Sequence, residues 1–166
     1  MKLVDYKKKF KEPLRQATLC FLILENKILL ARKKRGFAEG KMNGVGGKVS
    51  VGESVEDAAR RETFEEIGVK VKSLQKVAVL DFYFPHNRDW CQQVVVYEVR
   101  DWEGEPVETE EMVPAWYPFD EIPYEEMWAD DIYWLPLILK GKKVNASFLF
   151  NENEEILDYT IEEISE

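Results

Sequence analysis

The 166-residue chain is poor in the side chains that many enzymes use for catalysis and metal binding. It contains one histidine, His86, and two cysteines, Cys20 and Cys91, which fit no metal-ligand spacing. His86 stands between a proline and an asparagine in a predicted turn, so histidine catalysis and zinc chemistry are poorly supported. Each cysteine lies in an apolar, strand-like run, which predicts buried free thiols in a reducing compartment.

Long apolar runs and a basic surface are also missing. No stretch approaches the length of a membrane span, and the first ten residues lack the apolar region of a signal peptide. We therefore expect a cytoplasmic protein with no membrane partner. The formal net charge of −9 disfavours binding to polymeric nucleic acid, which requires a basic footprint. A nucleotide ligand stays open, because a bound metal supplies local positive charge.

Length and patterning predict a single α/β domain over residues 1–166, with residues 1–16 as an N-terminal arm. No repeat, low-complexity segment or linker divides it, and a monomer is the default. The apolar runs predict strands at 16–24, 27–33, 92–100, 115–119, 144–150 and 155–161, and one long strand or two at 69–84. Helices are expected at 54–68, at 121–127 and near 131–139, and an exposed loop at 101–111. A mixed sheet between helices is the economical arrangement.

The most informative stretch is the predicted helix between Ser54, a good N-cap, and Gly68, which suits the left-handed position past a helix end. On this helix Glu62, Glu65 and Glu66 stand at i, i+3 and i+4 and project from one side. Glu62 and Glu66 share the face of small apolar residues, so they are expected to be packed rather than fully solvated.

Clustered, partly buried carboxylates repel each other, and a hard divalent cation with oxygen ligands removes that cost. Mg²⁺ held by a few carboxylates and by substrate phosphates is the common form. The alternative is a solvated acidic face balanced by Arg60 and Arg61.

The segment from Gly47 to Val69 resembles the Nudix box of the Nudix hydrolases. It has Gly47, then five residues, Glu53, then seven residues and the run from Arg61 to Val69. Thr63 departs from the family, which usually has an aliphatic residue there, so its hydroxyl needs a hydrogen-bond partner. The fold implied by the resemblance is the Nudix α/β/α sandwich, with a mixed β-sheet between helices.

The resemblance also implies a reaction and a metal site. Nudix proteins hydrolyse a nucleoside diphosphate linked to another group, with Mg²⁺ as cofactor and Mn²⁺ as a substitute. Glu62, Glu66 and the Gly46 carbonyl are the expected ligands, and Glu65 is a third ligand or a base that orients water. Arg61 is expected to fix Glu65 by an i, i+4 pair, and Glu53 to cap the loop end and reach a second metal. The division between base and ligands stays open.

Two further stretches resemble one Nudix branch, the animal MutT homologues that hydrolyse oxidised purine nucleoside triphosphates. They are residues 33–48 and residues 108–137, and the resemblance extends from Ala17 to about Ile164. It implies cleavage of 8-oxo-dGTP, and of 2-hydroxy-dATP, to the monophosphate and pyrophosphate, which sanitises the nucleotide pool.

The base-binding residues implied by this branch are Thr18, Lys33, Phe37, Asn43, Phe82, Phe84, Trp128, Asp130 and Asp131. Trp128 would stack on the purine, while one of the two aspartates keeps a proton and donates to the base edge. Glu111 matches a carboxylate that reaches the metal site. As alternatives, the two aspartates cap the next helix, and Trp128 belongs to the core.

Two departures bear on base selectivity: Met42 replaces a tryptophan, and the segment 86–92 differs from the matching loop of the branch. Two other functions therefore stay open. One is a Nudix hydrolase for a canonical or modified NTP, a dinucleoside polyphosphate or a nucleotide sugar. The other is a non-catalytic nucleotide-sensing module, against which the intact box argues.

Overall fold

The computed structural model describes residues 1–36 and 38–164. The helices are α1 (Leu3–Lys9), α2 (Val55–Ile67) and α3 (Asp131–Leu139). The strands are β1 (Arg15–Leu24), β2 (Lys27–Lys33), β3 (Met42–Asn43), β4 (Lys70–Val71), β5 (Gln75–Tyr83), β6 (Gln92–Val99), β7 (Trp102–Glu103), β8 (Met112–Pro118), β9 (Lys143–Phe150) and β10 (Ile156–Ile164).

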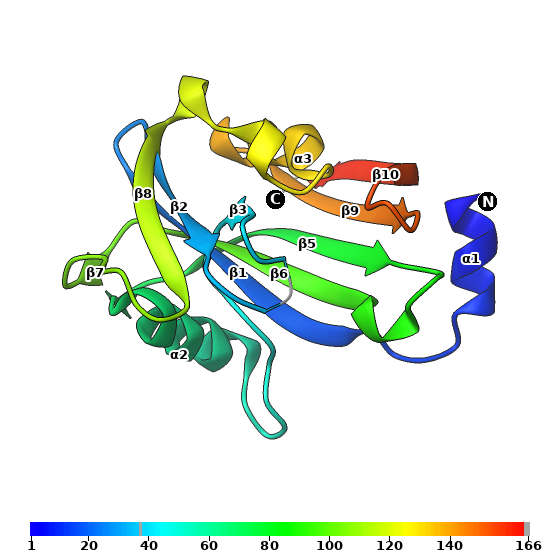
Figure 1. Ribbon diagram of the computed structural model, residues 1–166, viewed down its shortest axis with the longest axis horizontal. Coiled ribbons are helices and arrows are strands. Elements are labelled where there is room, and N and C mark those ends of the chain that lie inside the picture. Colours follow the sequence, from blue (N-terminus) through cyan, green and yellow to red (C-terminus); the bar gives the residue numbers. More distant parts are fainter. Residues whose placement is uncertain (37, 165–166) are drawn as a thin grey trace.

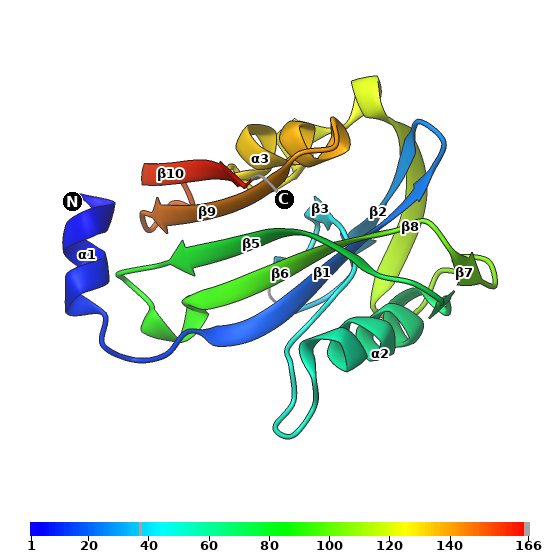
Figure 2. The same cartoon turned by 180° about the vertical axis from the view of Figure 1, so that it is seen from behind.

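A mixed sheet forms the middle layer, with the strand order β10-β9-β5-β6-β1-β2-β3 and with β8 paired to β2. The pairs β1–β6 and β5–β9 are parallel, and the other pairs of this sheet are antiparallel. Helix α2 covers one side of the strands and α3 the other (Figure 1 and, from behind, Figure 2). The predicted α/β architecture, a mixed sheet between helices, is confirmed.

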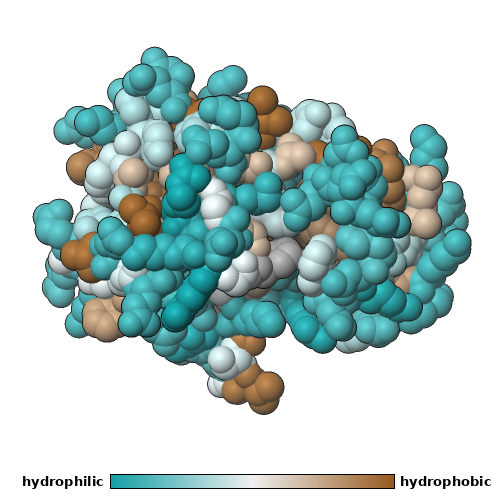
Figure 3. Space-filling model, viewed as in Figure 1, coloured by the Kyte–Doolittle hydropathy of each residue, from teal (hydrophilic) through white to brown (hydrophobic). Residues whose placement is uncertain are grey.

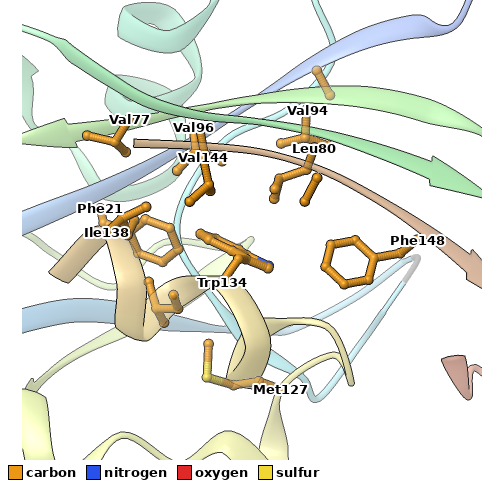
Figure 4. Close-up of a cluster of buried hydrophobic side chains, with 14 of the residues drawn as sticks. Phe21, Val77, Leu80, Val94, Val96, Met127, Trp134, Ile138, Val144 and Phe148 are labelled. Carbon is orange, nitrogen blue, oxygen red and sulfur yellow. The ribbon is translucent and has the colours of Figure 1, made fainter. Parts of the chain in front are cut away.

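Two apolar clusters fill the spaces between these layers. In the first, Trp134 of α3 lies among strand residues such as Phe21, Leu80 and Phe148 (Figure 4). In the second, Ala59 and Ile67 of α2 pack against the opposite sheet face. The face shown in Figure 3 is mostly hydrophilic, as expected for a chain with 33% charged residues. No helix in the described part of the chain is long and apolar enough to cross a membrane.

The helix that carries the carboxylates has the predicted ends. The Ser54 hydroxyl accepts a hydrogen bond from the Asp57 N–H at 3.1 Å, and Gly68 has a φ of 74°. The Thr63 hydroxyl, which needed a partner, donates to the Ala59 carbonyl at 2.8 Å. The strands predicted at 16–24 and 27–33 and those predicted at 144–150 and 155–161 are also confirmed, and within each set the two strands pair antiparallel. Both cysteines are buried and free, as predicted.

Three local predictions were wrong. Residues 121–127 form no continuous helix; 3₁₀ turns at Phe119–Glu121 and Tyr124–Glu126 are separated at Ile122, which takes the extended conformation that a following proline favours. The 101–111 segment is not all loop, because β7 pairs with β4. Strand β8 begins at Met112 rather than at 115, since its pairing with β2 extends to Lys33.

Candidate active site

The glycine-rich loop runs along β1 and presents Gly46 to the helix α2. The Thr18 N–H donates to the Gly47 carbonyl at 2.8 Å, and the Cys20 N–H donates to the Val45 carbonyl at 2.6 Å. Gly46, between these two contacts, directs its N–H away from β1 and towards α2. There its N–H donates to Glu66 Oε1 at 2.9 Å.

Glu66 is the most buried carboxylate of the box, with 9% of its surface exposed. Burial raises the pKa of Glu66 to about 7; the Gly46 N–H lowers it, and the charge of Glu62 raises it further. An acid held in this way is costly to ionise unless a cation lies beside it. The surroundings of Glu66 therefore favour either a proton or a metal ion.

Arg61 organises the other carboxylates. Its Nε lies 2.8 Å from Glu53 Oε2, and its Nη1 lies 2.8 Å from Glu62 Oε1 and 3.3 Å from Glu65 Oε2. Its Nη2 also donates to the Lys48 carbonyl at 3.1 Å. The expected i, i+4 pair with Glu65 is present, but Glu53 and Glu62 lie closer. These contacts lower the pKa of Glu53 to about 2, chiefly through the hydrogen bonds from Arg61.

The residues of the box fit a hard divalent cation. Glu62 and Glu66 supply carboxylate oxygens, and the backbone of Gly46 lies against Glu66 through its N–H. Within residues 1–36 and 38–164 no three acidic, histidine or cysteine side chains converge as a preformed metal cluster. Glu62 is held by Arg61, so binding an ion requires that the carboxylates exchange some of these contacts.

A cavity of about 280 Å³ lies next to Glu66, between the sheet and α3. Eight of the predicted base-binding residues line it: Thr18, Lys33, Asn43, Phe82, Phe84, Trp128, Asp130 and Asp131. Gly46 and Glu66 line it as well, so the carboxylate helix and the predicted base site share one cavity. Phe37 lies outside the described residues. Glu53, Arg61, Glu62, Glu65 and Glu111 do not line this cavity.

Glu111 is engaged elsewhere. Its carboxylate pairs with Arg35 at 2.7 Å, and its side chain is 42% exposed. The guanidinium of Arg35 lowers the pKa of Glu111. The structure therefore keeps Glu111 as an anion outside the cavity, and its predicted contribution to the metal site stays a prediction.

Asp130 and Asp131 are both only 2% exposed. Asp130 occupies the N-cap position of α3 but makes no capping bond; its Oδ2 accepts from Trp134 Nε1 at 2.7 Å. Among the described residues, Asp131 Oδ2 has no hydrogen-bond partner. Burial raises the pKa of Asp130 to about 6, and burial beside Asp130 raises that of Asp131 well above its ordinary range. A pair of this kind retains a proton near neutral pH and can offer both a donor and an acceptor.

Trp128 forms an aromatic wall of the cavity. Phe84 and Phe150 meet its ring edge-on, at centroid distances of 6.1 and 5.9 Å. The Lys41 ammonium lies 5.2 Å from the ring centroid and also lines the cavity. Trp128 packs against the core with its ring partly accessible, as a base-stacking residue requires.

Sequence reasoning did not assign Lys41 or Trp134 to this site. Trp134 is a fully buried core residue that also bonds Asp130, a contact that its position four residues later on one helix could have indicated. Lys41 had no local signal, because only the folded loop brings it over Trp128. Met42, the departure from the branch, is 2% exposed and points into the core instead of the cavity.

Alanine at Gly46 and at Gly47 is expected to fail in different ways. A Cβ on Gly46 would overlap the backbone carbonyl of Thr18, which cannot move without breaking β1. A Cβ on Gly47 would overlap only the carboxylate end of Glu62, which can rotate. We expect Gly46→Ala to lower the melting temperature strongly. Gly47→Ala should retain the fold but lower kcat by about 10- to 100-fold. Equal melting temperatures for the two variants would contradict this account.

The metal-free protein is expected to lose stability as the pH rises through the pKa of Glu66. In the folded state this pKa is about 7, against an ordinary value of 4.5. The folded state therefore binds more protons than the unfolded state between pH 4.5 and 7. The free energy of unfolding should fall over this range by up to about 3 kcal/mol. In EDTA, Glu66→Gln should gain stability relative to the wild type over this range. Glu65→Gln, at an exposed position, is the control. If the stability of Glu66→Gln changed with pH just as that of the wild type does, the raised pKa of Glu66 would be refuted.

Comparison with known proteins identifies the family. The family model described as NUDIX domain matches residues 13–138. The oxidized purine nucleoside triphosphate hydrolase of Danio rerio is 41% identical over 149 residues, which is 90% of this chain and 95% of that protein. The Mus musculus protein of the same name is 41% identical over 89% of this chain and 94% of its own length.

Solved structures agree on the fold. The crystal structure of a MutT protein from Bacillus halodurans superposes with a TM-score of 0.79, at 24% identity, and covers 90% of this chain and 98% of that one. The spacing of the box residues and these similarities lead to one assignment. The chain belongs to the NUDIX domain family and is a Nudix hydrolase.

Proposed function

We propose that this Nudix hydrolase uses Mg²⁺ to cleave oxidised purine nucleoside triphosphates, 8-oxo-dGTP foremost, to the monophosphate and pyrophosphate. One observation carries the proposal: the buried Asp130–Asp131 pair and the partly accessible Trp128 line the same cavity as Glu66. The relatives from zebrafish and mouse, similar over about nine-tenths of this chain, carry the name of that activity.

The cavity residues suit an oxidised purine. Trp128 offers an aromatic face for stacking, which every base can use. Asp130 accepts a hydrogen bond from Trp134, so the orphaned Asp131 Oδ2 is the better site for the shared proton. A donor and an acceptor side by side match the altered edge of 8-oxoguanine. The same pair, with its proton moved, suits 2-hydroxyadenine.

Glu62, Glu66 and the Gly46 carbonyl would hold the divalent ion. When bound, Mg²⁺ neutralises phosphate oxygens and activates a water for attack on a phosphorus atom. Arg61 orients Glu53, Glu62 and Glu65 through its ion pairs. Lys33, whose charge acts on Glu66, lines the cavity where it can meet the triphosphate. Glu65 is 56% exposed and can take or relay the proton of the attacking water.

The wider assignments belong to the same proposal. We place the protein in the cytoplasm as a single-domain monomer that acts on free nucleotides and not on polymeric nucleic acid, in keeping with its net charge of −9. Mn²⁺ would replace Mg²⁺, since both accept oxygen ligands.

A substrate panel with product identification tests the reaction class. The panel contains 8-oxo-dGTP, 2-hydroxy-dATP, the four canonical dNTPs, a dinucleoside polyphosphate and a nucleotide sugar, each with Mg²⁺ and with EDTA. We expect Mg²⁺-dependent release of pyrophosphate, fastest from the two oxidised purines. Faster cleavage of the dinucleoside polyphosphate or the nucleotide sugar would favour another Nudix substrate. Inactivity on the whole panel would favour a nucleotide-sensing module.

A further inference from the structure

Helix α1 lies ahead of the family match, which begins at residue 13, yet it is docked on the domain. It stands across the end of the sheet where β5 terminates (Figures 1 and 2). Leu3 and Tyr6 are buried, and the Leu3 N–H donates to the Asp158 carboxylate of β10 at 2.8 Å. The Leu3 end of the helix is therefore anchored to β10, while the Tyr6 ring meets Tyr83 of β5 edge-on at a centroid distance of 5.8 Å.

The other end contacts the loop between β5 and β6, residues 84–91. Phe10 meets the ring of Tyr83, just before this loop, edge-on at a centroid distance of 5.7 Å. The Arg88 guanidinium lies 5.2 Å from the Phe10 centroid and donates to Glu12 Oε1 at 2.8 Å. The aromatic contact thus joins Phe10 to the end of β5, and the cation–π contact and the ion pair join residues 10–12 to the loop itself.

The same loop carries a wall of the base cavity. Phe84 and Gln92, at the two ends of the loop, both line the cavity. The Phe84 N–H donates to Cys91 Sγ at 3.2 Å, which ties these ends together. Because the Phe84 ring meets Trp128 edge-on, a shift of the loop would move the wall beside the stacking residue.

We propose that Phe10 is a positioning residue: by holding Arg88 and Tyr83 it fixes the 84–91 loop and thereby sets the affinity of the cavity for the base. This inference rests on the proposed function for the identity of the ligand. Phe10 acts through Phe84 and does not line the cavity. We call the contacts of Phe10 with Tyr83 and Arg88 the clamp. Phe10 lies in the segment ahead of the family match, and the loop on which it acts is the one that departs from the family branch.

The test compares Phe10→Ala with Leu3→Ala, which weakens the same helix at its far end. Phe10→Ala is expected to raise the KM for 8-oxo-dGTP about fivefold without changing kcat, the loss expected from one aromatic contact. Leu3→Ala should lower the melting temperature without changing KM, and Phe10→Tyr, which keeps the ring, should restore the wild-type KM. An unchanged KM in Phe10→Ala, or an equal rise in Leu3→Ala, would overturn the inference.

Hydrogen exchange without substrate separates this inference from the proposed function. Backbone amides of residues 84–91 should exchange faster in Phe10→Ala than in Leu3→Ala, and Arg88→Ala should reproduce the effect without altering α1. If the wild type cleaves no oxidised purine, the proposed function fails and the exchange rates alone decide on the clamp. Equal exchange rates for the amides of residues 84–91 in all variants would refute the role of Phe10.

Discussion

Replacing Glu66 by glutamine is expected to lower kcat on the order of 10³-fold or more, with the fold intact. The substitution keeps the shape and the acceptor for the Gly46 N–H but removes the negative charge. Glu66 is the one carboxylate of the box that is buried in the helix and also lines the substrate cavity. As the proposed metal ligand, Glu66 would supply a charged oxygen, and its loss would remove most of the stabilisation that the metal gives the reacting phosphate.

The matched control is Glu56→Gln, in the first turn of the same helix and exposed. Both variants should melt within a few degrees of the wild type at pH 6. Steady-state kinetics should then show a loss only for Glu66→Gln, and titration calorimetry should show weakened Mg²⁺ binding only for that variant. Turnover of Glu66→Gln within about tenfold of the wild type would remove Glu66 from the reaction.

Asp131→Ala is expected to lower kcat/KM for 8-oxo-dGTP by about 100-fold, because a base edge then loses its buried partner. The same change should not destabilise the protein above pH 6. It removes a carboxyl that is 2% exposed and whose Oδ2 has no partner in the described part of the chain. Burial already raises the pKa of this group, so its ionisation at higher pH opposes folding.

The contrast between activity and stability makes this test specific. A merely structural aspartate would lower the melting temperature and the activity together. We expect the melting temperature at pH 8 to stay level or rise while kcat/KM falls. Asp120→Ala, at an exposed position outside the cavity, serves as the control and should change neither. A parallel loss of both quantities in Asp131→Ala would assign Asp131 to the scaffold.

Local signals predicted the carboxylate helix well. Ser54 and Gly68 mark its ends, and the i, i+3, i+4 spacing of Glu62, Glu65 and Glu66 needs no long-range information. The hairpin from Arg15 to Lys33 is equally local. Where local signals competed, sequence reasoning was less accurate: Pro123 breaks the helix expected around it, and β8 extends to Met112 only because β2 is there to pair with.

The cavity itself needed tertiary structure. Asn43, Phe84 and Trp128 come from distant parts of the chain, and only the resemblance to a family branch placed them together in advance. The resemblance assigned Asp130 and Asp131 to the base edge, and capping of the next helix was the alternative. The structure shows that Asp130 bonds Trp134 instead of capping the helix. The contacts of Arg61 with Glu53 and Glu62 likewise depend on how the 47–53 loop folds back on α2.

The central claim is that this cavity selects an oxidised purine and that the box cleaves its triphosphate. The most direct measurement is the ratio of kcat/KM for 8-oxo-dGTP to that for dGTP, with Mg²⁺, under identical conditions and with the products resolved. The account predicts a ratio well above about 10 and release of the monophosphate with pyrophosphate. A ratio near one, or release of the diphosphate and inorganic phosphate, would contradict it.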